Sequence, residues 1–336
     1  MKAEIKSRDE IHTNREKLED KIPLKTPYLI LIDPSDKCNF RCKFCPTGDL
    51  DLMKNTPGRN HGAMDFELYK KVINDLKEFD ENIKMLYLYK DGEPLLNPHF
   101  PEMIKYAKES NKINKISTTT NASLLNKELS LKIIESGLDQ IQISIEGINE
   151  EQYMNTSNVK IDFSKLVSNI EFFYKNKNHT NMYIKIVGNN LSDDDKNRFY
   201  DIFGNIADSV FIENATSIWY DFNIDNFSIE NSKTLYGKEV VKKKVCPQIF
   251  YSLAINSNGT VSPCCNDWSR RLLIGDTKTE KVKDIWNGTK LKNLQKLHLK
   301  GDRHLHSTCA SCGMPEYSSI DNIDKYAEDL LNKYYI

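Results

Sequence analysis

Three cysteines stand close together near the start of the chain: Cys38, Cys42 and Cys45, at spacings of three and two residues. Thiolates are soft ligands for zinc, copper(I) and iron-sulfur centres, and such a centre normally takes four of them. Three thiolates leave one metal corner without a protein ligand. The spacing therefore points to an iron-sulfur cluster with one open iron, and the alternatives are a chance grouping, a disulfide knot or an incomplete zinc site.

The triplet resembles the Cys-x3-Cys-x2-Cys signature of the radical S-adenosylmethionine (SAM) superfamily, in which an aromatic residue, here Phe44, commonly precedes the last cysteine. The resemblance implies that the open iron of a 4Fe-4S cluster chelates SAM. It also implies that an electron from the cluster cleaves SAM to a 5'-deoxyadenosyl radical. A flavodoxin- or ferredoxin-type protein is then expected as the electron donor.

Short β-rich apolar runs alternate with stretches of helical period over the first two thirds of the chain. The predicted strands are 28–32, 85–89, 114–118, 140–145, 182–187 and 209–212, and the predicted helices are 66–79, 99–109, 127–136, 163–174 and 194–203. This alternation predicts an α/β fold with a parallel sheet, either open or curled into a partial barrel. The resemblance implies the second form, a partial (β/α)6 TIM-like barrel with the triplet after its first strand.

Motifs at the ends of later strands extend the resemblance, and catalytic groups of such barrels gather there. Asp91-Gly92-Glu93-Pro94 resembles the GGEP element that holds the amino group of SAM, with Asp91 for the first glycine. Ordinary turn and helix-capping roles are the alternatives for each motif. The cofactor-binding residues that the resemblance implies are Phe44, Gly92, Glu93, Pro94, Thr120, Asn121, Ser144 and Glu146.

Two of these motifs depart from the family pattern. Thr120 and Asn121 precede Ala122, where glycine is usual, and Glu146 replaces the aspartate of a Ser-x-Asp-Gly element that contacts the ribose and carboxylate of the cofactor.

A second set of cysteines lies in the last third of the chain: Cys246, Cys264, Cys309 and Cys312. Their order and spacing resemble the twitch module, a shortened SPASM domain, which implies one auxiliary 4Fe-4S cluster. Four thiolates leave no open iron, so this cluster is expected to move electrons or position substrate. A zinc site is the competing interpretation, with His304 and His306 nearby but predicted to form a polar loop.

Cys265 is the cysteine left over. It either packs beside the auxiliary cluster or donates a hydrogen atom to a substrate radical as a catalytic thiol. Six residues at strand ends and in the following linker are candidates to face a substrate chamber: Tyr87, Tyr89, Lys90, Glu213, Trp219 and Tyr220.

Composition narrows the function further. The 336 residues are 39% hydrophobic with a formal net charge of -1, which favours a globular protein and argues against a nucleic-acid partner. Neither a signal peptide nor a membrane span is predicted, so we expect a cytoplasmic protein. The predicted parts are an N-terminal extension (1–26), a radical SAM partial barrel (27–222), a SPASM/twitch domain (223–317) and a C-terminal helix (318–336).

These features together predict a radical SAM oxidoreductase or epimerase. The architecture resembles that of 2-deoxy-scyllo-inosamine dehydrogenases, which implies hydrogen abstraction from a small-molecule substrate, a sugar or cyclitol in particular. Two alternatives stay open: oxidation or cross-linking of a peptide or protein, and a non-catalytic iron-sulfur or zinc protein.

Overall fold

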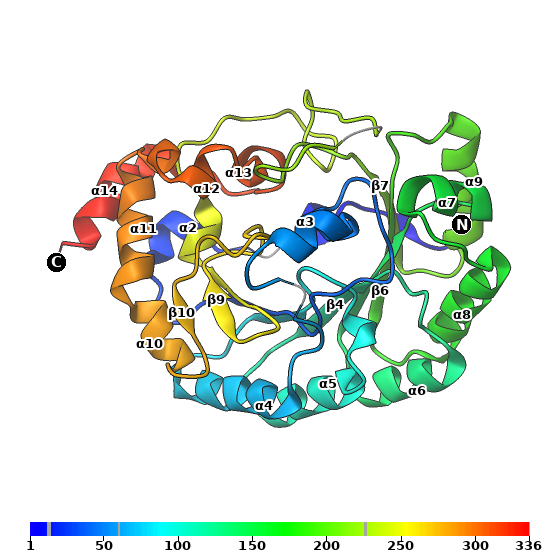
Figure 1. The fold of residues 1–336 in the computed structure, drawn as a ribbon, viewed down its shortest axis with the longest axis horizontal. Coiled ribbons are helices and arrows are strands. Elements are labelled where there is room, and N and C mark those ends of the chain that lie inside the picture. The colour runs from blue at the N-terminus through cyan, green and yellow to red at the C-terminus, as the bar shows by residue number, and fades with distance from the viewer. Residues whose placement is uncertain (12–14, 60, 225–226, 336) are drawn as a thin grey trace.

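Six parallel strands form the centre of the protein (Figure 1). The computed structural model describes residues 1–11, 15–59, 61–224 and 227–335. The strands are β2 (Leu29–Ile32), β3 (Met85–Leu88), β4 (Ile116–Thr120), β5 (Gln140–Ile145), β6 (Asn181–Val187) and β7 (Ser209–Glu213). Each pairs in parallel with the next along the chain, and the first and last of them, β2 and β7, do not pair with each other. The predicted partial barrel is therefore present and open.

Helices cover the outer face of this sheet, and most of those that follow a barrel strand begin at a side-chain cap; the helix that starts at Phe100 has none. Those that follow the barrel strands are α3 (Leu50–Asn55), α4 (Phe66–Asp75), α5 (Phe100–Glu109), α6 (Lys127–Glu135), α7 (Glu150–Ser157), α8 (Phe163–Asn176) and α9 (Asp193–Phe203). Asp65, the N-cap of α4, accepts a hydrogen bond from the backbone N–H of Leu68 at 2.9 Å. Gly137, just after the end of α6, has φ +86°, a conformation that suits glycine.

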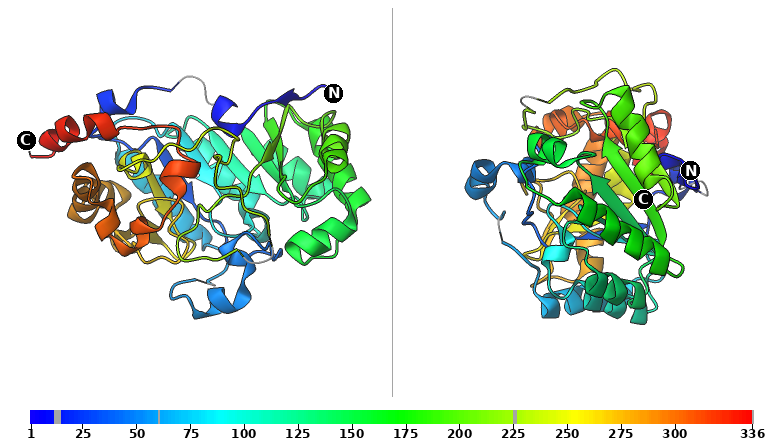
Figure 2. Two further views of the ribbon diagram at one scale, coloured as in Figure 1. Left: turned by 90° about the horizontal axis from the view of Figure 1, so that it is seen from above. Right: turned by 90° about the vertical axis from the view of Figure 1, so that its right-hand side faces the viewer.

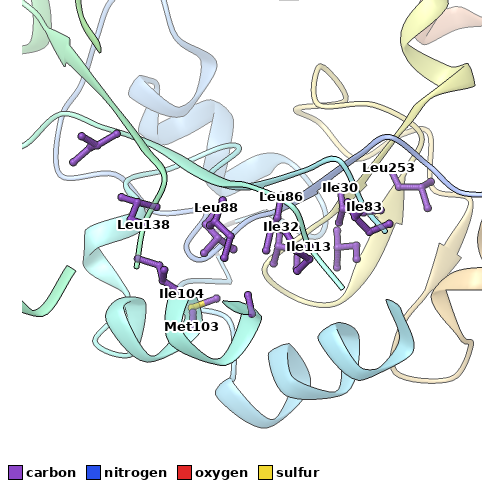
Figure 3. Close-up of a cluster of buried hydrophobic side chains, with 14 of the residues drawn as sticks. Ile30, Ile32, Ile83, Leu86, Leu88, Met103, Ile104, Ile113, Leu138 and Leu253 are labelled. Atoms are coloured by element: carbon purple, nitrogen blue, oxygen red, sulfur yellow. The ribbon is translucent and has the colours of Figure 1, made fainter. Parts of the chain in front are cut away.

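The two faces of the strands differ in composition, as the period-2 pattern predicts. Alternate residues such as Ile30, Leu86 and Ile184 belong to the main hydrophobic core between the sheet and its helices. Figure 3 shows part of this core, where Leu86 and Leu88 of the sheet lie near Met103 and Ile104 of α5. The intervening residues face the inside of the barrel, so the core fixes which side chains are available for chemistry.

The sheet continues beyond the barrel on both edges. On one edge, β8 (Ser252–Ile255) pairs in parallel with β2, followed by the antiparallel strands β9 (Thr260–Ser262) and β10 (Gly275–Asp276). On the other, β1 (Glu4–Ile5) pairs in parallel with β7. The region predicted as a separate cysteine-bearing domain thus shares a ten-stranded sheet with the barrel.

Both chain ends pack on the body of the protein. The N-terminal segment carries α1 (Arg8–Ile11) and α2 (Leu18–Lys21) and runs across the molecule from the β7 edge toward the C-terminal helices (Figure 2). The remaining helices are α10 (Val282–Asn287), α11 (Thr289–Leu299), α12 (Ser307–Ala310), α13 (Met314–Tyr317) and α14 (Ala327–Lys333). No helix among the described residues is long and apolar enough to span a bilayer.

One predicted element is wrong in extent. The sequence predicts a C-terminal helix over 318–336, yet α14 covers only Ala327–Lys333. The preceding residues are held by the body of the protein instead, because the Asp324 carboxylate accepts hydrogen bonds from the backbone N–H groups of Lys244 and Val245, both at 2.9 Å. Residues 12–14 of the predicted N-terminal extension and residue 336 of the predicted helix lie outside the described residues.

Candidate active site

The cysteine triplet lies in the loop after β2, and its last member, Cys45, lines the chamber inside the barrel. The backbone N–H groups of Arg41 and Lys43 donate to carbonyls at the end of α7, at 2.9 and 3.0 Å. The Cys42 thiol lies 3.1 Å from the Ser157 hydroxyl. The indole N–H of Trp219 donates to the carbonyl of Phe44 at 3.2 Å, which ties the loop to the residues after β7.

Burial keeps these thiols protonated as long as no metal is bound. Burial raises the pKa of Cys38 to about 12 and also raises the pKa values of Cys42 and Cys45. Such thiols bind metal as thiolates, so the positive charge of a bound iron centre is needed to hold them deprotonated. Within the described chain, no three His, Cys, Asp or Glu side chains are spaced to hold a single metal ion.

Gly92 lies where a larger residue would not fit. A Cβ atom built on it would overlap the carbonyl oxygens of Lys37 and Ser35, in the loop that leads to the triplet. The next residue, Glu93, donates its backbone N–H to the same Lys37 carbonyl at 2.9 Å. The Gly-Glu step therefore packs the β3 loop directly onto the triplet loop.

The Glu93 side chain joins two strand ends. Its carboxylate accepts hydrogen bonds from the Thr120 hydroxyl at 2.6 Å and from the backbone N–H groups of Asn121 at 2.8 Å and Leu95 at 3.1 Å. Burial raises its pKa to about 7 against the lowering effect of these donors. Pro94 begins the short 3-10 turn that follows.

Asn121 extends this network to the triplet loop, since its amide donates to the Asn39 side chain at 2.9 Å. Ala122 has φ +58°, which explains the usual glycine at that position. The predicted residues Glu93, Thr120 and Asn121 are thus brought together.

Ser144 lies near the end of β5, and Glu146 directly follows that strand. Burial raises the pKa of Glu146 to about 7, while the nearby Lys185 ammonium lowers it. The Glu146 charge also lies close enough to Cys42 to raise the pKa of that thiol. This carboxylate is therefore part of the electrostatic surroundings of the triplet.

A buried charge network explains the aspartate that replaces the first glycine of the GGEP element. Asp91 lies 2.8 Å from Lys90, 3.4 Å from Arg59 and 3.7 Å from Arg270. Arg270 also pairs with Asp36 at 3.0 Å. Although burial raises it, these three cations hold the pKa of Asp91 below its usual value. The network links the barrel loops to the region after β9.

The four cysteines of the second set lie around one small cavity, as their spacing predicts. Cys246, Cys264, Cys309 and Cys312 all line it. Arg303 holds the last two in place by donating to both of their carbonyls at 3.1 Å, and the Asn266 amide donates to the Cys312 sulfur at 3.1 Å. His304 is exposed and, like His306, does not line this cavity.

His298 is a residue of this site that sequence reasoning missed. It is fully buried on α11, lines the same cavity, and its Nδ1 accepts a hydrogen bond from the Cys246 backbone N–H at 3.4 Å. Burial lowers its pKa to about 3, so the ring is neutral and its proton sits on Nε2. A lone histidine at helical spacing carries no sequence signal for such a place.

A chamber of about 380 Å³ opens inside the barrel, and both Cys45 and Cys265 line it. Its aromatic wall consists of Phe44, Tyr87, Tyr89, Trp219, Tyr236 and Tyr251. Its charged wall consists of Arg8, Asp9, Arg15, Lys90, Lys185 and Glu213. Five of the six predicted chamber residues line it.

The sixth, Tyr220, does not, because its hydroxyl bonds Asp267 at 2.8 Å beside the second set of cysteines. The three charged residues from the N-terminal segment were not foreseen.

Comparison with known proteins decides the family. Residues 32–201, half of the chain, match the model of the radical SAM superfamily. The chain belongs to the radical SAM superfamily. Residues 246–313 match the SPASM model, an iron-sulfur cluster-binding domain. This radical SAM protein therefore takes a 4Fe-4S cluster and SAM in its barrel and an auxiliary iron-sulfur cluster in its SPASM region.

Solved structures of radical SAM proteins share the fold at low sequence identity. One is BtrN in complex with AdoMet and 2-DOIA, with 16% identity and a TM-score of 0.54 over 88% of this chain and 94% of that one. Another is anSMEcpe with bound AdoMet, with 19% identity and a TM-score of 0.60 over 92% and 96%. A third is Streptococcus suis SuiB bound to the precursor peptide SuiA, with 16% identity and a TM-score of 0.62 over 89% and 72%.

Curated relatives match only part of the chain. A tungsten-containing aldehyde ferredoxin oxidoreductase cofactor-modifying protein from Pyrococcus furiosus is 29% identical over 38% of this chain and 33% of its own length. A probable GTP 3',8-cyclase from Methanococcus maripaludis is 36% identical over 35% of this chain and 36% of its own length. The matched segments thus span about a third of these relatives, which act on different substrates by name.

Proposed function

We propose that this radical SAM enzyme oxidises or epimerises a small polyhydroxylated molecule, a sugar or cyclitol, in the chamber lined by Cys45 of the first cysteine set and by Cys265. The chamber carries the proposal, because about 380 Å³ lies in the size range of small-ligand sites and it touches both Cys45 and Cys265. When bound and reduced, the cluster and SAM supply a primary carbon radical that abstracts a hydrogen atom. The protein supplies orientation and exclusion of water.

The ligand assignments follow from this proposal. Cys38, Cys42 and Cys45 hold the SAM-binding cluster, and Cys246, Cys264, Cys309 and Cys312 hold the auxiliary cluster. Gly92, Glu93, Pro94, Thr120 and Asn121 shape the SAM site on one side of the triplet, with Phe44, Ser144 and Glu146 on the other. A flavodoxin- or ferredoxin-type donor in a reducing compartment, such as the cytoplasm, suits a chain with eight free thiols.

Polar groups along the inner wall favour a hydroxyl-rich substrate. Glu213 is only 2% exposed, and among the described residues its carboxylate oxygen Oε1 has no hydrogen-bond partner. The same holds for Gln142 Oε1 and the Tyr183 hydroxyl, which line a smaller cavity together with Arg8. Buried polar atoms normally have partners, so these positions call for water or ligand hydroxyls.

Cys265 separates the two outcomes of hydrogen abstraction. If its thiol returns a hydrogen atom to the substrate radical, the product is an epimer; if an electron passes to the auxiliary cluster and a proton leaves, an alcohol becomes a ketone. We favour dehydrogenation, since the Cys265 side chain packs with Leu31, Tyr87 and Tyr89 in an apolar cluster. The variant Cys265→Ser should then keep product formation within about threefold. Loss of product with intact SAM cleavage would instead support epimerisation.

Peptide modification is the second candidate function. A surface cavity lined by Ser217, Trp219 and Phe222 shares Trp219 with the chamber, so the two cavities are neighbours on either side of this side chain. The similar structures SuiB and anSMEcpe have been solved with peptides. A pull-down with short cysteine- or serine-containing peptides tests this candidate against the sugar proposal.

The decisive experiment for the proposed function has two stages. Dithionite-reduced, cluster-loaded protein should release 5'-deoxyadenosine from SAM, and no release would favour a non-catalytic metalloprotein. A screen of sugars and cyclitols in D2O then follows deuterium incorporation and ketone formation. Turnover of a peptide but of no sugar would overturn the small-molecule assignment.

A further inference from the structure

We infer that Arg8 is an anion-binding residue of the chamber, so that the substrate carries a carboxylate or phosphate group. This inference rests on the proposed function, because it names the chemical class of the molecule that the chamber takes. It concerns a residue of the N-terminal segment, outside the matched family regions.

The position of Arg8 is fixed by two aromatic rings of β3 and its following loop. Its guanidinium lies 5.0 Å from the centre of the Tyr87 ring and 6.0 Å from that of Tyr89. Its Nη2 donates to the Tyr89 hydroxyl at 2.8 Å. Cation–π contact orders the guanidinium plane while most of its five N–H donors stay available. The segment that carries it is anchored because β1 pairs with β7.

The other cations of the chamber already have carboxylate partners. Lys185 pairs with Glu213 at 2.6 Å, and Lys90 pairs with Asp91 at 2.8 Å. Arg15 pairs with Asp321.

The remaining chamber carboxylate, Asp9, pairs with Lys238 outside the chamber. Among the described residues, no carboxylate lies within ion-pair distance of Arg8. Among the described chamber residues, Arg8 is therefore the cation without a carboxylate partner.

The chemistry of the guanidinium selects the ligand class. A cation in a partly desolvated chamber gains from an anionic partner, and the planar fork of arginine matches carboxylate and phosphate oxygens in a bidentate manner. A neutral sugar would leave this charge unpaired, and an amine would add a second positive charge. The geometry thus favours an acidic or phosphorylated polyol over an amino sugar.

The test compares matched probes on cluster-loaded protein with SAM present. The probes are glucuronate and glucose 6-phosphate as carboxylate and phosphate arms, and glucose and glucosamine as neutral and cationic counterparts, with binding followed by tryptophan fluorescence because Trp219 lines the chamber. Either anion should bind at least about tenfold more tightly than glucose. Equal binding of glucose, or no binding of either anion at about 10 mM, would overturn the inference.

Variants of Arg8 identify the residue responsible. Arg8→Gln should weaken anion binding by about 10- to 100-fold, and Arg8→Lys should give an intermediate loss because it keeps the charge without the fork. Arg15→Gln is the matched comparison and should weaken binding by less than about threefold, since Asp321 already pairs with Arg15.

Equal losses in Arg8→Gln and Arg15→Gln, with unchanged circular dichroism, would overturn the assignment to Arg8. Release of 5'-deoxyadenosine by the wild-type protein is measured in parallel, and its absence would refute the proposed function while the binding result stands.

Discussion

Replacement of Arg270 by methionine tests whether the buried charge network joins the barrel to the SPASM region. The Arg270 side chain is 1% exposed, pairs with Asp36 at 3.0 Å and lies 3.7 Å from Asp91. Removing one partner of a buried ion pair costs about 3–5 kcal/mol, because the other charge stays buried. Asp91 keeps Lys90 and Arg59, so the groups that lose their cation are Asp36 and, at 3.8 Å from Arg270, Asp33.

Asp36 itself keeps two backbone donors, the N–H groups of His61 at 3.0 Å and Gly62 at 2.6 Å. The expected loss therefore lies near the lower end, about 3 kcal/mol. The matched control is Arg271→Met, which breaks a half-exposed pair with Asp221 and should cost about 0–1 kcal/mol.

The assay is anaerobic urea unfolding of the cluster-loaded protein, followed by circular dichroism, for both variants and for Asp36→Asn with and without Arg270→Met. The two single changes should be non-additive by about 1–3 kcal/mol, because they remove the same contact. Equal midpoints for Arg270→Met and Arg271→Met would refute the reasoning.

Two further changes have defined outcomes. Gly92→Ala should displace the triplet loop, because its Cβ would overlap the Lys37 and Ser35 carbonyls, and so reduce the iron content of reconstituted protein from about eight to about four per chain. Leu96→Ala, at an exposed residue of the same loop, should keep its iron, and equal losses would count against this account. Burial beside Asp91 raises the pKa of Asp33 from 3.8 to about 7, so the folded state binds this proton more tightly than the unfolded state. That stabilisation is present at low pH and is lost as the pH rises through about 7. Asp33→Asn should therefore gain stability relative to wild type by more than about 1 kcal/mol between pH 5 and pH 8 in urea titrations, and a constant difference would contradict the assignment.

The sequence predicted the parts whose signals are local. The six barrel strands are visible because outward residues such as Ile141, Ile143 and Ile145 alternate with inward polar ones. Both cysteine sets carry fixed spacings, and the structure gathers the second set around one cavity.

Features that depend on distant pairing were missed. β8 joins β2, although more than 200 residues separate them and β8 has no alternation of its own, being buried throughout. Arg8 and His298 acquire their roles from Tyr87 and the Cys246 backbone, partners that no local pattern indicates. The predicted helix over 318–336 is too long because the amphipathic period continues through residues where the Asp324 carboxylate instead accepts a hydrogen bond from the backbone of Lys244.

The central claim is that the triplet cluster has one iron free for SAM. Electron paramagnetic resonance of the dithionite-reduced variant Cys309→Ala/Cys312→Ala, which leaves the triplet cluster, measures this most directly. The spectrum should change when SAM is added, whereas that of Cys38→Ala/Cys42→Ala, which retains the auxiliary cluster, should not. An unchanged spectrum in the first variant, or a SAM-dependent change in the second, would contradict the claim.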